Sequence, residues 1–186
     1  MGFSPDFLII LKAFILQNIN SLSDLLSILP KCKNKDFKRI VSYLQISESD
    51  LAEFATWDST SYTRNCIDRT DDYELLLLCW EEGQVTDIHC HGGEECWVYL
   101  AKGKLHEKRF NYNDELSFKN ELIMEKEGLS YMNDKLGYHS LHNIAKGRSM
   151  SLHLYVGPID ECTIYDEDEE DFVVKSLSYD TENSTL

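Results

Sequence analysis

Residues 83–103 read GQVTDIHCHGGEECWVYLAKG and contain two histidines separated by one residue. Side chains on a β-strand alternate between its faces, so His89 and His91 on a strand would share a face and could converge on one metal ion. Apolar runs at residues 75–78 and 97–100 stand on either side and favour a sheet. Two histidines can also fall two apart by chance on a polar strand, so the pair alone does not decide.

Residues 5–56 predict N-terminal α-helices that pack rather than carry chemistry. Within this range apolar side chains recur at steps of three and four residues, for example over residues 7–15. Ser21 or Ser23 could cap a short helix that Pro30 ends.

Residues 62–165 predict a β-domain, with one of its strands over residues 88–91. Short strands recur about every ten residues with glycines in or near the gaps, which is typical of a β-barrel or a double-sheet sandwich. With the helices they are expected to form one domain over residues 1–165. Residues 166–171 are all acidic, and the segment 166–186 is expected to be a solvated tail, disordered by default.

Composition narrows the class of function. The chain has 186 residues and a formal net charge of −15, which argues against a nucleic-acid partner or an anionic membrane. No segment has the pattern of a signal peptide or a transmembrane helix. Six scattered cysteines predict reduced thiols in a cytoplasmic protein, with a monomer as the default state. An anionic substrate would need a few well-placed basic groups.

A third histidine, His139, lies between Gly137 and Asn143. This arrangement, together with the pair His89 and His91, resembles the two sequence motifs of the cupin family. The resemblance implies a mainly β fold, a cupin-type β-barrel (a double-sheet jelly roll) with N-terminal α-helices. It also implies that the three histidines coordinate one metal ion from inside the barrel.

Cys96 stands where the general cupin pattern has a glutamate ligand. Three neutral imidazoles without a carboxylate suit Fe(II), Zn(II) or Cu(II), and they leave up to three positions open on a six-coordinate metal. That is room for a bidentate substrate plus dioxygen. Alternatively, Cys96 could be a fourth ligand, which would close the site and favour structural zinc.

Further short motifs occur in order between about residues 55 and 165. They are Tyr62-Thr63-Arg64-Asn65, His89-x-His91 with Cys96, Asn133-Asp134 before Gly137-Tyr138-His139, and Ser151-Leu152-His153-Leu154-Tyr155 with Asp160 and Cys162. Together they resemble the cysteine dioxygenase family of the cupins. The resemblance implies an Fe(II) enzyme that oxidises free L-cysteine with dioxygen to cysteine sulfinic acid.

The resemblance assigns roles to the polar residues. Arg64 would hold the substrate carboxylate with its planar fork, helped by the hydroxyl of Tyr62. Ser151, His153 and Tyr155 alternate along one strand and therefore share a face, where the resemblance implies a hydrogen-bonded relay that ends beside the iron. The plainer alternative is a half-buried strand whose polar residues face solvent.

The resemblance also implies a protein-derived cofactor, a thioether that joins Cys96 to Tyr155. Cys162 would line the pocket entrance and Trp80 would pack beneath the site. Cys90 is opposite in parity to its two neighbouring histidines and is expected to be a packing residue.

Other functions remain open at this point. One is a thiol dioxygenase for another small thiol such as 3-mercaptopropionate, although Arg64 and Cys96 favour cysteine. Another is a non-catalytic metal-binding cupin or a structural-zinc module. A storage site needs no substrate clamp, so Arg64, His153 and Tyr155 argue against a non-catalytic metal-binding cupin, whereas iron content and activity would decide about a structural-zinc module.

Overall fold

The helical part of the chain packs beside the β-domain in the computed structural model, which describes residues 19–183; the periodicity at residues 7–15 lies outside that range. Ser21 and Ser47 begin helices because each side chain accepts a backbone N–H three residues on. The helices are α2 (Leu22–Ile28), α3 (Asn34–Val41) and α4 (Glu48–Leu51), with 3-10 turns η1 (Leu29–Lys31), η2 (Ala52–Phe54) and η3 (Asp134–Leu136).

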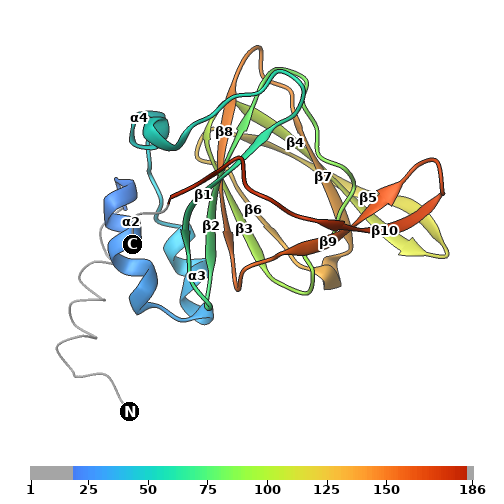
Figure 1. Cartoon of the computed structure of the whole chain (residues 1–186), viewed down its shortest axis with the longest axis horizontal. Coiled ribbons are helices and arrows are strands. Elements are labelled where there is room, and N and C mark those ends of the chain that lie inside the picture. The colour runs from blue at the N-terminus through green and yellow to red at the C-terminus, as the bar shows by residue number, and fades with distance from the viewer. Residues whose placement is uncertain (1–18, 184–186) are drawn as a thin grey trace.

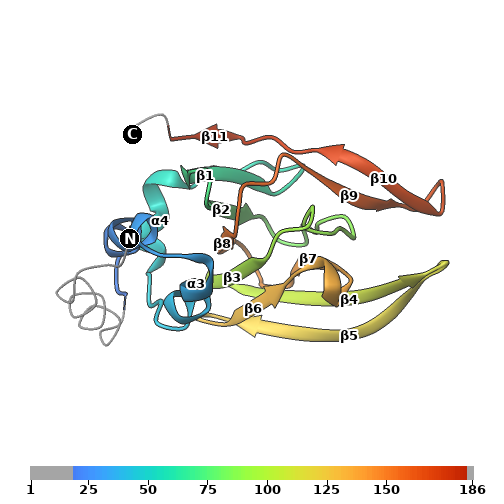
Figure 2. The same cartoon turned by 90° about the horizontal axis from the view of Figure 1, so that it is seen from below.

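Two sheets face one another in the β-domain (Figures 1 and 2). One has the strand order β11-β1-β2-β8-β3-β6. The other contains β5-β4-β7 and the hairpin β10-β9, joined where His89 bridges His139 on one side and Ile164 on the other. The strands are β1 (Thr63–Arg69), β2 (Glu74–Trp80), β3 (Cys96–Lys102), β4 (Lys104–Asn113), β5 (Glu115–Glu125), β6 (Leu129–Met132), β7 (Tyr138–Asn143), β8 (Ser149–Tyr155), β9 (Glu161–Asp166), β10 (Asp171–Ser176) and β11 (Thr181–Glu182).

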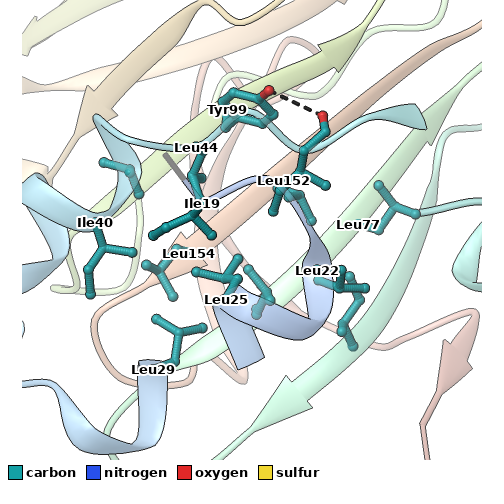
Figure 3. Close-up of a cluster of buried hydrophobic side chains, with 14 of the residues drawn as sticks. Ile19, Leu22, Leu25, Leu29, Ile40, Leu44, Leu77, Tyr99, Leu152 and Leu154 are labelled. Carbon is teal, nitrogen blue, oxygen red and sulfur yellow. Dashed lines mark hydrogen bonds between the residues drawn. The ribbon is translucent and has the colours of Figure 1, made fainter. Parts of the chain in front are cut away.

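The central strands β2 and β8 of the six-stranded sheet are buried on both faces and have no exposed residue. One face packs against the helices, where Leu77 and Leu152 belong to one buried cluster with Leu25 of α2 (Figure 3). The other face, with Leu76 and Leu78, points into the space between the two sheets. Each fully buried leucine contributes roughly 1.5–3 kcal/mol, so both packing layers stabilise the sheet.

The expected fold class, mainly β with a double sheet and N-terminal helices, is confirmed. The predicted strand over residues 88–91 is wrong, because this segment is paired only through isolated bridges at His89. The physical reason is local: Gly92 and Gly93 turn the chain at positive φ, and the carboxylate of Asp134 binds the N–H of His91 in place of a strand partner.

The structure also differs from the expected disordered tail over residues 166–186, because the chain through Glu182 is folded. The acidic run forms the tip of the β9–β10 hairpin, where Asp166 accepts the N–H groups of Asp168 and Glu169. Phe172 follows this run and stacks on Tyr138, with ring centroids 4.0 Å apart. Apolar residues beyond the acidic run therefore provide the packing that a charge count overlooks. No helix within residues 19–183 is long and apolar enough to cross a membrane.

Candidate metal centre and substrate pocket

His89, His91 and His139 come together inside the barrel. One nitrogen of each ring lies within 4.8 Å of the others, and the ring centroids are 4.6–5.5 Å apart. His91 and His139 are buried and His89 is half-buried. The sequence motif therefore does place three imidazoles around one point, although His89 and His91 lie on a paired loop rather than a strand.

The free nitrogens of this cluster fit a metal ion. His91 Nδ1 and His139 Nε2 are buried without a hydrogen-bond partner, a state that is costly unless something else binds them. Burial, aided by the neighbouring His139, lowers the pKa of His89 to about 3 and the pKa of His91 as well. Both rings are therefore neutral near pH 7 and keep a lone pair for a metal. Three imidazoles that converge in this way suit a non-haem metal centre.

Glu107 on β4 orients His139, although no motif in the sequence identifies Glu107. Its Oε1 lies 2.8 Å from His139 Nδ1, while Arg109 and Ser130 donate hydrogen bonds to the same carboxylate. Burial by itself would raise the pKa of Glu107, but the hydrogen bonds from His139, Arg109 and Ser130 lower it to about 2. The carboxylate thus holds the Nδ1–H tautomer of His139 and leaves Nε2 free for a metal. Glu107 lies two residues after the buried Leu105 on the same strand, so the two side chains share a face, and this spacing was the signal in the sequence.

Two aspartates hold the other two histidines. The backbone carbonyl of Asp87 accepts a hydrogen bond from His89 Nδ1 at 2.8 Å, and this bond turns Nε2 of the ring toward the cluster. The Asp134 carboxylate accepts the N–H groups of His91 at 2.8 Å and Gly93 at 2.7 Å. Asp134 belongs to one of the short motifs noted in the sequence, and its structural task is to hold the histidine loop.

A pocket lies beside the cluster, and its lining includes one arginine. Arg64 Nε and Nη2 are buried without a hydrogen-bond partner. Unpaired guanidinium donors in a pocket that is largely shielded from water attract a carboxylate strongly. Tyr62 stacks on Trp80, with ring centroids 4.8 Å apart, and stands next to Arg64 in the lining. Cys162, predicted at the entrance, lines the same pocket.

Ser151, His153 and Tyr155 face the barrel interior from β8, while the two leucines between them face the helices. The solvent-facing alternative is therefore wrong. Trp80 Nε1 donates to Ser151 Oγ at 3.0 Å, and Ser151 Oγ is hydrogen-bonded to His153 Nε2 at 2.9 Å. Burial and nearby His139 lower the pKa of His153, which keeps the ring neutral. The Tyr155 ring lies nearly parallel to that of His153, 6.4 Å between centroids.

Cys96 and Tyr155 are direct register partners on neighbouring strands, and both are almost fully buried. Burial raises the pKa of the Cys96 thiol and of the Tyr155 phenol, so both are neutral. Among the described residues, the group of converging ligand atoms contains the three histidines and not Cys96. This disfavours the closed structural-zinc site that the sequence left open.

The remaining candidates have ordinary roles, and a further set was missed. Cys90 packs against Thr163, its sulfur 3.0 Å from the hydroxyl oxygen, and His106 pairs with Glu121 on the outside of the sheet. The missed pocket residues share an origin outside the recognised motifs: they are Leu78, Thr86, Asp87, Leu141, Ile159, Ile164, Lys175 and Leu177. No sequence motif points to Lys175 or Leu177, because the acidic run before them predicts a solvated tail.

Comparison with known proteins points in one direction. The family model "Cysteine dioxygenase type I" matches residues 16–168. Cysteine dioxygenase type 1 of Rattus norvegicus is 33% identical over 159 residues, covering 79% of this chain and 80% of the relative. The Homo sapiens protein of the same name is 32% identical over the same share of both chains.

A solved structure agrees on the fold. A Klebsiella pneumoniae protein with a double-stranded β-helix domain superposes with a TM-score of 0.50 at 11% identity, covering 68% of this chain and 95% of that chain. Such low identity concerns the fold alone, and it supports the cupin-type double sheet.

Glu107→Gln is expected to weaken metal binding about 10- to 100-fold, because the amide cannot hold the Nδ1–H tautomer of His139 as a carboxylate does. Metal affinity is measured by titration of the metal-free protein. Glu121→Gln is the matched control, since it changes a glutamate 2.9 Å from His106 on the outer surface. Equal affinities for both variants would show that Glu107 does not support the metal centre.

Proposed function

The chain belongs to the cysteine dioxygenase type I family, and from this premise we propose that it oxidises free L-cysteine with dioxygen to cysteine sulfinic acid at an iron centre. His89, His91 and His139 would hold the iron. The observation that carries the proposal is the pair of unpartnered, buried nitrogens of Arg64 in the pocket that His89 also lines.

The donor set and the family reaction together favour iron. Three neutral imidazoles suit Fe(II), Zn(II) and Cu(II) alike, but zinc has no redox chemistry and could not serve a dioxygenase. When bound, Fe(II) supplies the position where a thiolate and dioxygen can meet. The protein provides the three imidazoles, the clamp for the rest of the substrate and a site largely closed to water.

Arg64 sets the orientation of the substrate. A carboxylate held by the guanidinium directs the thiol and amine of cysteine toward the histidine cluster, and Tyr62 adds a hydroxyl on the same side of the pocket. The net charge of −15 repels anions in general, so this local cationic clamp has to overcome the field of the whole protein. A charge-assisted, bidentate contact is strong enough to do so.

Ser151 and His153 position Tyr155. The hydrogen bond to Ser151 holds the His153 ring, which lies nearly parallel to the Tyr155 ring at 6.4 Å between centroids and limits where the phenol can turn. Because burial raises the pKa of Tyr155, the phenol keeps its proton and can donate a hydrogen bond to the reacting sulfur or to the substrate carboxylate. These three residues with Cys96 make up the proposed catalytic group.

Cys96 and Tyr155 are proposed to form a thioether between the sulfur and the ring carbon beside the hydroxyl. Their cross-strand register brings the two side chains together on the interior face. The reaction removes the thiol hydrogen and one ring hydrogen, and dioxygen is the oxidant that accepts them. The bond would immobilise the phenol and would remove a thiol that competes for iron.

The cellular setting is part of the proposal. All the cysteines in the chain are free, as expected in a reducing cytoplasm. The strong negative charge gives no footprint for nucleic acid or an anionic membrane, and a monomer is the simplest state.

A thiol dioxygenase for 3-mercaptopropionate is the second candidate function, but it leaves the pairing of Cys96 with Tyr155 unexplained.

The direct test is to load the protein with Fe(II) without air and then add L-cysteine and air. Equal amounts of oxygen consumed and cysteine sulfinate formed are expected, with little turnover of 3-mercaptopropionate. Turnover of mercaptopropionate alone would rule out cysteine as the substrate. Absence of oxygen uptake with either thiol would rule out a thiol dioxygenase.

Arg64→Ala is expected to raise the KM for L-cysteine about 10- to 100-fold, the loss of one or two charge-assisted hydrogen bonds. Iron content should stay at the wild-type level, because Arg64 is not among the converging ligands. Arg39→Ala, which removes an exposed arginine on α3, should leave the KM unchanged. A wild-type KM in Arg64→Ala would contradict the clamp.

The thioether predicts an intact mass lower by two hydrogen atoms after turnover with iron and dioxygen. Cys96→Ala and Tyr155→Phe should each abolish this difference, and Cys162→Ala should keep it although it also removes a buried thiol near the pocket. A mass difference that persists in Cys96→Ala would assign the modification to other residues.

A further inference from the structure

The segment after β9 closes one side of the substrate pocket. Lys175 of β10 and Leu177 line it together with Arg64 and His89. Figure 2 shows this part of the chain running from β10 back to β11 beside β1. Both residues lie beyond position 168, where the family match ends, so this wall belongs to a part of the chain that the match does not describe.

This wall is firmly anchored to the strand that carries Arg64. Asp180 donates its backbone N–H to the carbonyl of Arg64 at 2.8 Å, and its carboxylate accepts the Arg64 N–H at 2.7 Å. β11 then pairs with β1 in parallel, with Asn65 opposite Thr181. The wall therefore keeps a defined position relative to the clamp.

One ion pair crosses the mouth of the pocket. Lys175 Nζ lies 2.7 Å from Asp87 Oδ2, and the two side chains are 49% and 46% exposed. Lys175 comes from the C-terminal hairpin, whereas Asp87 lies on the loop that carries His89. The pair thus ties the clamp side of the pocket to the metal side. Its exposure makes it weak enough to open and close in solution.

We propose that the ion pair between Lys175 and Asp87, which we call the latch, restricts the pocket to thiols the size of one amino acid. The inference rests on the proposed function and adds a specificity determinant to it. The histidine cluster receives the thiol and amine of the substrate, and Arg64 receives its carboxylate. The latch lies outside these anchors and limits how far a ligand can extend.

L-Cysteinylglycine is the discriminating probe. This dipeptide keeps the free thiol and amine of cysteine but carries its carboxylate one residue further out, by up to about 3.5 Å. Because Arg64, Asp87 and Lys175 line one pocket, the added residue has to fit among these side chains. There Lys175 is already neutralised by Asp87, whose own charge repels the incoming carboxylate.

The experiment compares binding of L-cysteine and L-cysteinylglycine to the iron-loaded full chain without air, by calorimetry, and then kcat/KM for both thiols. The double variant Asp87→Ala/Lys175→Ala removes the latch without leaving an unpaired charge. It should shift the affinity ratio toward the dipeptide by about five-fold, which an ion pair of this exposure can sustain. Lys175→Arg keeps the pair and should keep the wild-type ratio.

A matched control removes an equivalent ion pair elsewhere. Lys102 Nζ lies 2.7 Å from Glu48 Oε2, with side chains 42% and 53% exposed, and neither residue lines the pocket. Glu48→Ala/Lys102→Ala should leave the ratio unchanged. The single variant Asp87→Asn, which retains the backbone carbonyl beside His89, should shift the ratio in the same direction as the latch variant, because the freed Lys175 can receive the dipeptide carboxylate.

The outcomes separate the latch from the function beneath it. A wild type that binds both thiols equally, or a latch variant with the same ratio as its control, overturns the latch and leaves the cysteine site standing. A wild type that does not bind cysteine overturns both. Selective binding of cysteine that is relaxed by the latch variant and kept by Lys175→Arg supports the latch.

Discussion

The central strands β2 and β8 are buried on both faces, and this burial decides which side chains reach the metal centre. Along β8, apolar side chains must face the helices, where Leu152 and Leu154 pack. The intervening positions Ser151, His153 and Tyr155 are left for the barrel interior. Because a strand alternates with period two, the helical layer that stabilises the sheet also holds the three polar residues on the side of the metal centre.

The metal centre depends on a different device, polar anchoring of loops. His89 is held to β7 by backbone hydrogen bonds with His139, whereas His91 is followed by glycines at positive φ. Glu107 binds the His139 ring and Asp134 binds the backbone of His91, so each carboxylate holds one of the three histidines. A buried carboxylate with several donors is more rigid than a loop alone, which is what convergence of three rings requires.

Charge is distributed unevenly between the pocket and the rest of the chain. The chain is strongly acidic, yet the pocket contains Arg64 with two buried donors lacking partners. The C-terminal hairpin adds Lys175, matched by Asp87 at the mouth. A cationic centre behind a neutral ion pair would admit a small zwitterion and hinder a longer one. The acidic run itself remains at the tip of the hairpin, where water screens it.

Strand parity and short motifs are local properties, so the sequence alone predicts the fold class and picks out the three histidines, Arg64 and the alternating row on β8 as candidates. It could not identify Glu107, whose partner His139 is 32 residues away. It misjudged the C-terminal segment, because charge density suggests solvation while packing of Phe172 and pairing of β11 decide otherwise. These features appear only in the folded chain, since each is a contact between residues distant in the sequence.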